Sequence, residues 1–184
     1  AAEKAGRKRG KPILIALRVP DSVGYCRGIG LDLERWMELK LFDIMVAGGN
    51  MRLNPWESSV ELCRKYGIQL LASLDMPRFD EPPGLLIRDI PEAWHARQAA
   101  ALTAGVDGLY YFNVFTPERV KNLMLGSEAD VKYLDKRYFL TDIVIDTPNK
   151  YLLNGERFNR LPRLSSLDPV RLQPGRPRRF PLTF

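Results

Sequence analysis

The chain contains few of the residues on which metal and nucleophile chemistry is usually built. Its 184 residues include only two cysteines, Cys26 and Cys63, and one histidine, His95. Cysteines without a second pair or a histidine cluster nearby do not form a metal-binding motif, and they predict free thiols. A single histidine gives little basis for a Ser-His-Asp triad, and the alanine-rich stretch around His95 favours an exposed structural position. We therefore expect neither a metal site nor a cofactor.

The sequence also lacks a long hydrophobic run. No apolar stretch approaches the roughly 18 residues that a membrane-spanning helix needs. The basic residues of positions 1–11 are not followed by the apolar segment of a signal peptide. The sequence thus predicts no membrane span and leaves the compartment open, with the periplasm and the extracellular space among the alternatives.

Positive charge is concentrated at the two ends of the chain. The formal net charge is +6, while residues 1–11 and the stretch after position 170 each carry a net charge of +4. The body between them is therefore mildly acidic. Basic ends beside such a body are typical of solvated tails rather than of a surface that follows a phosphate backbone. We expect no nucleic-acid partner.

What the sequence does contain is an alternation of strand-like and helix-like stretches, with a hydrophobic fraction of 45% that is typical of a globular protein. Each strand-like segment ends in a small polar or charged cluster. This order predicts an α/β fold of four parallel βα units, in which chemistry gathers at the carboxyl ends of the strands. The predicted strands are Ile13–Arg18, Phe42–Gly49, Ile68–Asp75 and Gly108–Asn113.

The first predicted strand has a feature of its own. Ile13–Leu17 is a continuous apolar run, which predicts a strand covered by helices on both faces. The stretch that follows, residues 21–31, contains three glycines and predicts a loop. Asp32 can then cap the next helix at its N-terminus.

The second helix has stronger boundary signals. Asn54 followed by Pro55 is typical of a helix start, and Glu57, three residues after Asn54, fits the spacing of a capping box. Gly67 predicts the C-terminal end of the same helix.

Two aspartates recur in the same position of the pattern. Asp43 and Asp107 each follow a predicted helix and precede a predicted strand. This recurrence indicates one repeated unit. Residues before a parallel strand lie at the end of the sheet opposite to the active site of a barrel, so we expect both aspartates to be structural.

The composition divides the chain into three regions. Residues 1–11 form a basic tail or the remnant of an upstream helix, and residues 12–140 hold the βα units. Residues 141–184 contain repeated prolines and a Pro174–Gly175 turn signal between two short apolar stretches, which predicts a linker and the first strands of a β-rich domain.

Four βα units can belong to two architectures. An eight-stranded (β/α)8 barrel takes ~250 residues, so four units would be half of one. We expect the C-terminal half of such a barrel. An open four-stranded sheet is the alternative.

Four motifs support a resemblance. They are RVPDS at 18–22, GLDLERW at 30–36, RLNPWE at 52–57 and AGVDGLYYFN at 104–113. They resemble the later half of uncharacterised glycoside-hydrolase-like barrel proteins of polysaccharide-degrading bacteria, over about residues 13–184. The resemblance implies a barrel followed by a small β-sandwich, and a carbohydrate substrate whose glycosidic bonds are cleaved when the full barrel is present. The missing half would come from an upstream segment or from a second copy.

Glycoside hydrolysis needs two carboxyl groups, in most families ~5 to 9.5 Å apart. Asp75 directly follows the third strand and would point into the catalytic mouth of a barrel, although a loop-capping role is the alternative. Asp21 follows the first strand and is the candidate partner, with a turn aspartate as the alternative. Glu57 is the third candidate carboxylate, because a role in a capping box already accounts for its position.

The binding candidates are polar and aromatic side chains at the same predicted rim. A charge at the end of a buried strand needs a partner or a ligand, so Arg18 can bind a uronate or orient Asp75. Amides and guanidinium groups suit hydroxyl-rich ligands, and flat rings stack on sugars, although Trp56 can equally belong to the core. The substrate-binding candidates are Arg18, Asn50, Arg52, Trp56, Asn113 and Phe115, with Phe112 as a further ring.

Two other functions fit the same pattern. One is a non-catalytic carbohydrate-binding or scaffold module that lacks the acid pair. The other is phosphate-ligand binding at Gly48-Gly49-Asn50, near a helix start, although a Gly-Gly pair without a fuller fingerprint is a weak signal.

Overall fold

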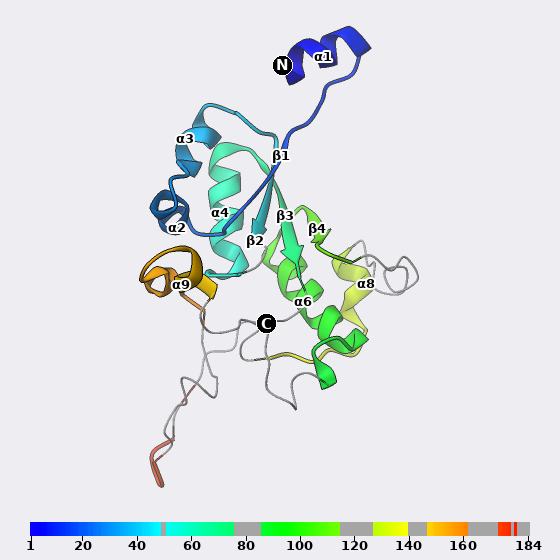
Figure 1. The fold of residues 1–184 in the computed structure, drawn as a ribbon. Coiled ribbons are helices and arrows are strands. Elements are labelled where there is room, and N and C mark those ends of the chain that lie inside the picture. Colours follow the sequence, from blue (N-terminus) through cyan, green and yellow to red (C-terminus); the bar gives the residue numbers. More distant parts are fainter. Residues whose placement is uncertain are drawn as a thin grey trace.

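A parallel β-sheet forms the centre of the protein. The computed structural model describes residues 1–48, 51–75, 86–114, 127–139, 147–161, 173–177 and 179. Helices and strands alternate along these residues (Figure 1). The strands are β1 (Ala16–Val19), β2 (Ile44–Gly48), β3 (Gln69–Leu74) and β4 (Gly108–Tyr111). They form one all-parallel sheet in the order β1-β2-β3-β4, which confirms the predicted α/β fold.

Helices connect and flank these strands. The long ones, α4 (Trp56–Tyr66) and α6 (Pro91–Ala104), follow β2 and β3 in the chain. In Figure 1, the N-terminal helix α1 stands away from the sheet, at the end of the segment that leads into β1. The remaining helices are α1 (Ala2–Arg9), α2 (Val23–Gly28), α3 (Leu33–Glu38), α8 (Glu128–Lys132), α9 (Thr147–Tyr151) and the 3-10 helix η1 (Gly155–Phe158).

The predicted helix boundaries are confirmed in part. The Asp32 carboxylate accepts a hydrogen bond from the backbone N–H of Arg35 and caps α3, as predicted. Gly67 ends α4 with a φ of 59°, a conformation that favours glycine. The predicted capping box was wrong, because α4 begins at Trp56 and the Asn54 side chain instead donates to the backbone oxygen of Asp21.

Helix α2 lies where the glycines predicted a loop. The Ser22 side chain accepts a hydrogen bond from the backbone N–H of Tyr25 and caps this short helix. Gly24 and Gly28 lie where a segment distant in sequence approaches: a Cβ at Gly24 would lie 2.6 Å from Phe158, and one at Gly28 the same distance from Leu152. The glycines here permit close packing rather than breaking the helix.

The two faces of the sheet have different environments. Alternate residues of each strand belong to one buried cluster that also contains residues of α3, α4 and α6. The residues on the other face, among them Ala16, Ile44, Leu71 and Tyr110, do not belong to this cluster. The strand residues in the cluster are Leu17, Val19, Met45, Ala47, Leu70, Ala72, Leu74, Leu109 and Tyr111. Helices α3, α4 and α6 therefore pack on one face of the sheet.

The prediction for the first strand was wrong in its start and in its burial. The strand begins at Ala16 rather than Ile13, and Leu14 and Ile15 are 59% and 42% exposed. The run predicts a strand covered on both faces, but Ala16 is exposed and only Val19 of β1 is buried. An apolar run alone does not distinguish these two situations.

Asp43 and Asp107 make the same contact at two places in the sheet. The Asp43 carboxylate accepts from the backbone N–H of Ile15 at 2.8 Å, just before β1. The Asp107 carboxylate accepts from the backbone N–H of Leu70 in β3 at 2.7 Å. Each aspartate precedes a strand and holds the start of the neighbouring strand. This confirms their predicted structural role and the repeated unit.

The segment 147–161 packs against α2, although residues 141–184 were predicted as a linker and the start of a β-domain. The Tyr25 hydroxyl donates to the backbone oxygen of Pro148 at 3.1 Å, and the Tyr25 and Phe158 rings meet edge to face. Farther on, a bridge between Gln173 and Arg176 confirms the predicted turn. The two short strands predicted around that turn, at 170–172 and 180–184, lie outside the described residues.

None of the helices in the described ranges is long and apolar enough to cross a membrane, in agreement with the sequence.

We expect Asp107→Ala to lower the free energy of unfolding by about 1–2 kcal/mol, because the Leu70 N–H would lose its carboxylate acceptor. Asp43→Ala should have a smaller effect, since its partner lies in an exposed segment. Urea unfolding followed by circular dichroism measures both changes. Glu61→Ala, an exposed position on α4, is the control and should stay within about 0.5 kcal/mol of the wild type. Equal stability of Asp107→Ala and this control would contradict the structural role.

Candidate functional site

An ion pair spans the carboxyl ends of three strands. Arg18 belongs to β1 and Asp75 follows β3, and their Nη2 and Oδ2 atoms are 3.5 Å apart. Because β2 lies between β1 and β3, the Arg18 side chain must cross β2 to reach Asp75. At the end of β2 stands Gly48, which has no side chain and has a φ of 95°. The structure therefore brings together two of the predicted site residues.

Asp75 is held by more than the ion pair. The Ser73 hydroxyl donates to Oδ1 of Asp75 at 3.2 Å, and Arg97 on α6 donates to the backbone oxygen of Asp75. The Asp75 side chain is only 10% exposed. A carboxylate with these partners has a fixed position at the end of its strand.

The Arg18 guanidinium also stacks on an aromatic ring. Its Cζ atom lies 3.6 Å from the centre of the Phe112 ring, which follows β4. The Nε and Nη2 atoms of Arg18 are buried, and neither has a hydrogen-bond partner among the described residues. Nη2 is the atom that faces Asp75 in the ion pair, so this edge of the guanidinium is turned toward the carboxylate.

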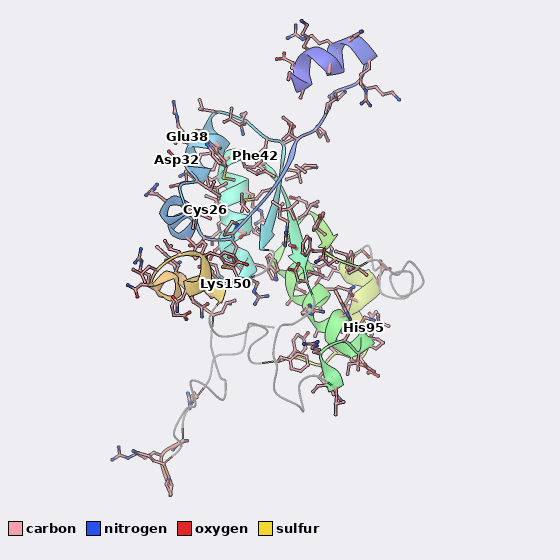
Figure 2. The ribbon with its side chains drawn as sticks, in the orientation of Figure 1. Cys26, Asp32, Glu38, Phe42, His95 and Lys150 are labelled. Atoms are coloured by element: carbon pink, nitrogen blue, oxygen red, sulfur yellow. The ribbon has the colours of Figure 1, made fainter. Side chains whose placement is uncertain are left out.

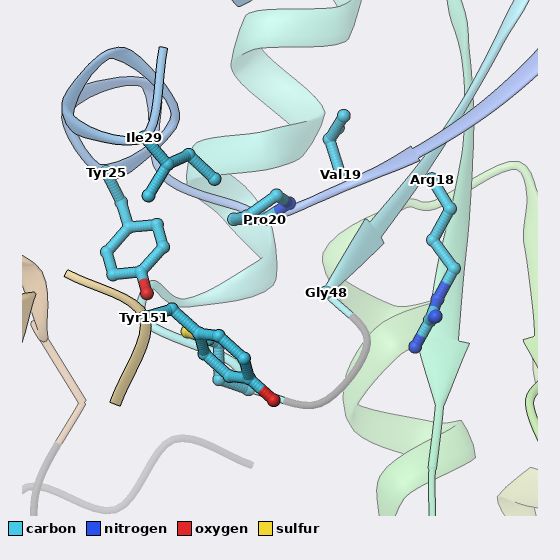
Figure 3. Close-up of a pocket in the computed structure, with 8 residues that line it drawn as sticks. Arg18, Val19, Pro20, Tyr25, Ile29, Gly48 and Tyr151 are labelled. Carbon is cyan, nitrogen blue, oxygen red and sulfur yellow. The ribbon is translucent and has the colours of Figure 1, made fainter. Parts of the chain in front are cut away.

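A cavity of about 390 Å³ adjoins this group (Figure 3). Its wall includes the aromatic side chains of Tyr25 from α2 and Tyr151 from α9. In Figure 3, Arg18 lies at one end of the cavity, and Tyr25 and Ile29 lie at the other. The residues that line it are Arg18, Val19, Pro20, Tyr25, Ile29, Gly48, Met51 and Tyr151.

Asp21 has a different environment from Asp75. It is 4% exposed, and its carboxylate accepts hydrogen bonds from the backbone N–H groups of Leu53 and Asn54 at 2.8–3.0 Å. Burial raises the pKa of Asp21 to about 6, although these hydrogen bonds and the charge of Arg52 oppose the shift. Asp21 thus holds the loop after β2, and its carboxylate is not available to a substrate.

Trp56 lies near Gly48, and Arg52 lies near Trp56. Trp56 is 4% exposed and belongs to the buried cluster, which is the core role given as the alternative for this residue. The Arg52 guanidinium lies over its ring at 5.2 Å. A sugar cannot stack on a ring that is buried in this way, so Arg52 rather than Trp56 can contribute to a binding surface.

The other predicted binding residues have separate outcomes. Asn113 is exposed beyond the end of β4 with a φ of 55°, in the left-handed region that asparagine tolerates. Asn50 and Phe115 lie outside the described residues.

Sequence reasoning missed the tyrosines of the cavity. Tyr25 lies in the stretch predicted as a loop, and Tyr151 lies in the predicted linker. The packing that brings α9 against α2 leaves no periodic signal in the sequence. Ser73 was detectable, because it precedes Asp75 by two residues and therefore shares its face of the strand.

The cysteines and the histidine do not contribute to this site. Cys26 and Cys63 are free and fully buried, and burial raises the pKa of both thiols to about 12. Figure 2 places Cys26 on α2 and His95 on α6, and the His95 ring contacts the backbone oxygen of Asp135. The described residues contain no cluster of three or more histidine, cysteine or carboxylate side chains that could hold a metal ion.

Comparison of the sequence with protein-family models gives no match, and comparison with curated proteins gives no significant match either.

The raised pKa of Asp21 predicts a pH dependence of stability. The folded protein holds this proton up to about pH 6, whereas the unfolded chain loses it near pH 3.8. The contribution of Asp21 to the free energy of unfolding is therefore complete below about pH 4. It is lost as the pH rises through 6. The lost contribution is about 3 kcal/mol, from a shift of about two units.

Asp21→Asn removes this titration. We expect the fall in the free energy of unfolding between pH 4 and pH 7 to be smaller in this variant than in the wild type, as measured by urea unfolding across that range. Asp135→Asn, at an exposed position, should retain the wild-type dependence. The same dependence in wild type and Asp21→Asn would contradict the assignment.

Proposed function

We propose that this chain is the C-terminal half of a (β/α)8 barrel that acts on carbohydrates and hydrolyses glycosidic bonds when the barrel is complete. In this proposal Asp75 is one of the two catalytic carboxylates. The observation that carries it is the Arg18–Asp75 pair, which lies beside a cavity at the carboxyl ends of parallel strands. Barrel enzymes place their active sites at this end of the sheet.

The strand order supports a barrel over an open sheet. Connections between parallel strands are almost always right-handed, so strands that follow in sequential order place their helices on one face. A doubly wound sheet reverses its strand order and covers both faces. The order β1-β2-β3-β4 and the single helix-packed face both fit the barrel. The other face, which carries Arg18, Val46 and Ser73, would then line the interior.

The environment of Asp75 suits one of the two catalytic roles. A carboxylate beside a guanidinium group works best in its charged form, which is the form of a nucleophile or a general base. The protonated partner would come from the other half of the barrel. Asp21 is not used in this role, because its carboxylate is buried against backbone N–H groups.

One observation favours a second candidate, a carbohydrate-binding module without catalysis. Asp75 is engaged by Arg18 and Ser73 at its carboxylate and by Arg97 at its backbone oxygen. Such contacts can also serve only to fix the strand ends. The phosphate-binding alternative at Gly48-Gly49-Asn50 stays a prediction, because Gly49 and Asn50 lie outside the described residues.

Asp75→Asn tests the catalytic role in the natural full-length protein. We expect kcat on a polysaccharide that the wild type cleaves to fall about 100- to 10,000-fold, because the amide is neither a base nor a nucleophile. Release of reducing sugar measures the rate. Asp135→Asn is the matched control and should keep full activity. Unchanged turnover in Asp75→Asn would remove this residue from the mechanism, and sugar binding without cleavage by the wild type would favour the second candidate.

A further inference from the structure

We infer that the cavity beside Arg18 binds an aromatic ring, the aglycone of a glycoside, whose sugar extends toward Arg18 and Asp75. This inference rests on the proposed carbohydrate function and names the class of substrate that the site takes.

The first step is the apolar character of the cavity wall. Val19, Tyr25 and Met51 line it as buried side chains, and they come from β1, from α2 and from the segment after β2. Ile29 and Tyr151 line it as well and are 37% and 50% exposed, so solvent reaches this part of the wall. Transfer of an apolar ring from water to such a wall is favourable in proportion to the area buried. The cavity therefore favours an apolar ligand.

The second step is the supply of polar groups at the wall. Among the described residues that line the cavity, only Arg18, Tyr25 and Tyr151 have side-chain oxygen or nitrogen atoms. The Tyr25 hydroxyl donates to the backbone oxygen of Pro148. The Nη2 atom of Arg18 faces Asp75. A sugar carries hydroxyls around its ring, and each one buried without a partner costs free energy, whereas an aromatic ring has no such requirement. The wall thus suits the aglycone better than the sugar.

The third step is that packing fixes the aromatic wall in place. The Tyr25 and Phe158 rings meet edge to face, with their centroids 6.1 Å apart. Gly28 permits the close approach of Leu152 to α2, and the neighbouring Tyr151 lines the cavity. A wall that is already ordered loses little conformational entropy when a ligand binds. The cavity volume of about 390 Å³ lies within the range of small-molecule sites and is ample for an aromatic ring.

The fourth step is the position of the cavity relative to Asp75. Arg18 lies at one end of the cavity, and Tyr25 and Ile29 lie at the other (Figure 3). Arg18 also forms the ion pair with Asp75. A ligand whose ring lies against Tyr25 and Tyr151 therefore directs its other end toward Arg18 and the proposed catalytic carboxylate. An aryl glycoside is such a ligand, because its ring and its sugar are joined at the bond that hydrolysis cleaves.

The test compares three probes, which are phenyl β-D-glucoside, methyl β-D-glucoside and phenol. Each is titrated into the isotope-labelled chain and followed by NMR. We expect the wild type to bind phenyl β-D-glucoside about 10- to 100-fold more tightly than methyl β-D-glucoside, because burial of the phenyl ring removes apolar surface from water. Phenol should bind about tenfold or more weakly than phenyl β-D-glucoside, because it lacks the contacts of the sugar.

Variants of the accessible wall locate the bound ring. Tyr151→Ala should reduce the preference for the phenyl glucoside about fivefold or more, and Tyr151→Phe should retain it, because the ring rather than the hydroxyl forms the wall. Ile29→Ala should reduce the preference by a smaller factor, and it provides the test if Tyr151→Ala does not fold. Tyr133→Ala is the matched control, since Tyr133 is 85% exposed and does not line the cavity. Circular dichroism checks that each variant is folded.

The failures are distinguishable. If the wild type binds both glucosides equally, the aglycone inference is overturned and the proposed carbohydrate function stands. A wild-type preference in both Tyr151→Ala and Ile29→Ala would place the ring elsewhere and also overturn the inference. If phenol binds as tightly as phenyl β-D-glucoside, the sugar makes no contact, so the aglycone inference is overturned and the carbohydrate proposal loses its support from this cavity. If none of the three probes binds, both the inference and the carbohydrate proposal lose their basis.

Discussion

The pleat of the parallel sheet is the constraint on which the other features depend. Residues two apart in a strand share a face, and the register aligns these residues across all four strands. One set packs against the helices, and the other set includes Arg18 and Ser73. A shift of one residue in a strand would exchange its two sets of side chains, and in β1 it would bury Arg18 among apolar side chains, at a large cost in free energy. The site and the core thus fix the same register.

The segments that follow β1 and β2 are joined by polar contacts as well as by apolar packing. Asp21 holds Leu53 and Asn54 through their backbone N–H groups, and the Asn54 amide returns a hydrogen bond to the Asp21 backbone. A buried carboxylate is costly unless donors surround it, and here they are backbone groups with little freedom to move. This arrangement places Met51 at the cavity wall. The shape of the cavity therefore depends on Asp21, although Asp21 is not among the residues that line it.

Much of the fold could be predicted from the sequence, because its strongest signals are local. The apolar segments, the Asp32 cap and the Gly67 end all act within a few residues. Asp43 and Asp107 make long-range contacts, but their repeated position before a strand was visible in the sequence. The parallel order then brought Arg18 and Asp75 to the same end of the sheet. Asn54 shows the limit: its position next to Pro55 fitted a helix cap, but a tertiary contact with Asp21 takes the side chain. The tyrosines of the cavity could not be predicted, because Tyr25 and Tyr151 meet only through long-range packing.

The hydrogen bonds of Asp43 and Asp107 bear on how such a sheet can grow. Each uses a carboxylate on one unit and a main-chain N–H on its neighbour. Every amino acid except proline has that N–H, so this hydrogen bond requires almost no particular residue in the adjoining strand. Modules linked in this manner can be duplicated, exchanged or appended while their side chains diverge. The contacts at the amino ends of the strands are therefore generic, and they leave the side chains at the carboxyl ends free to vary.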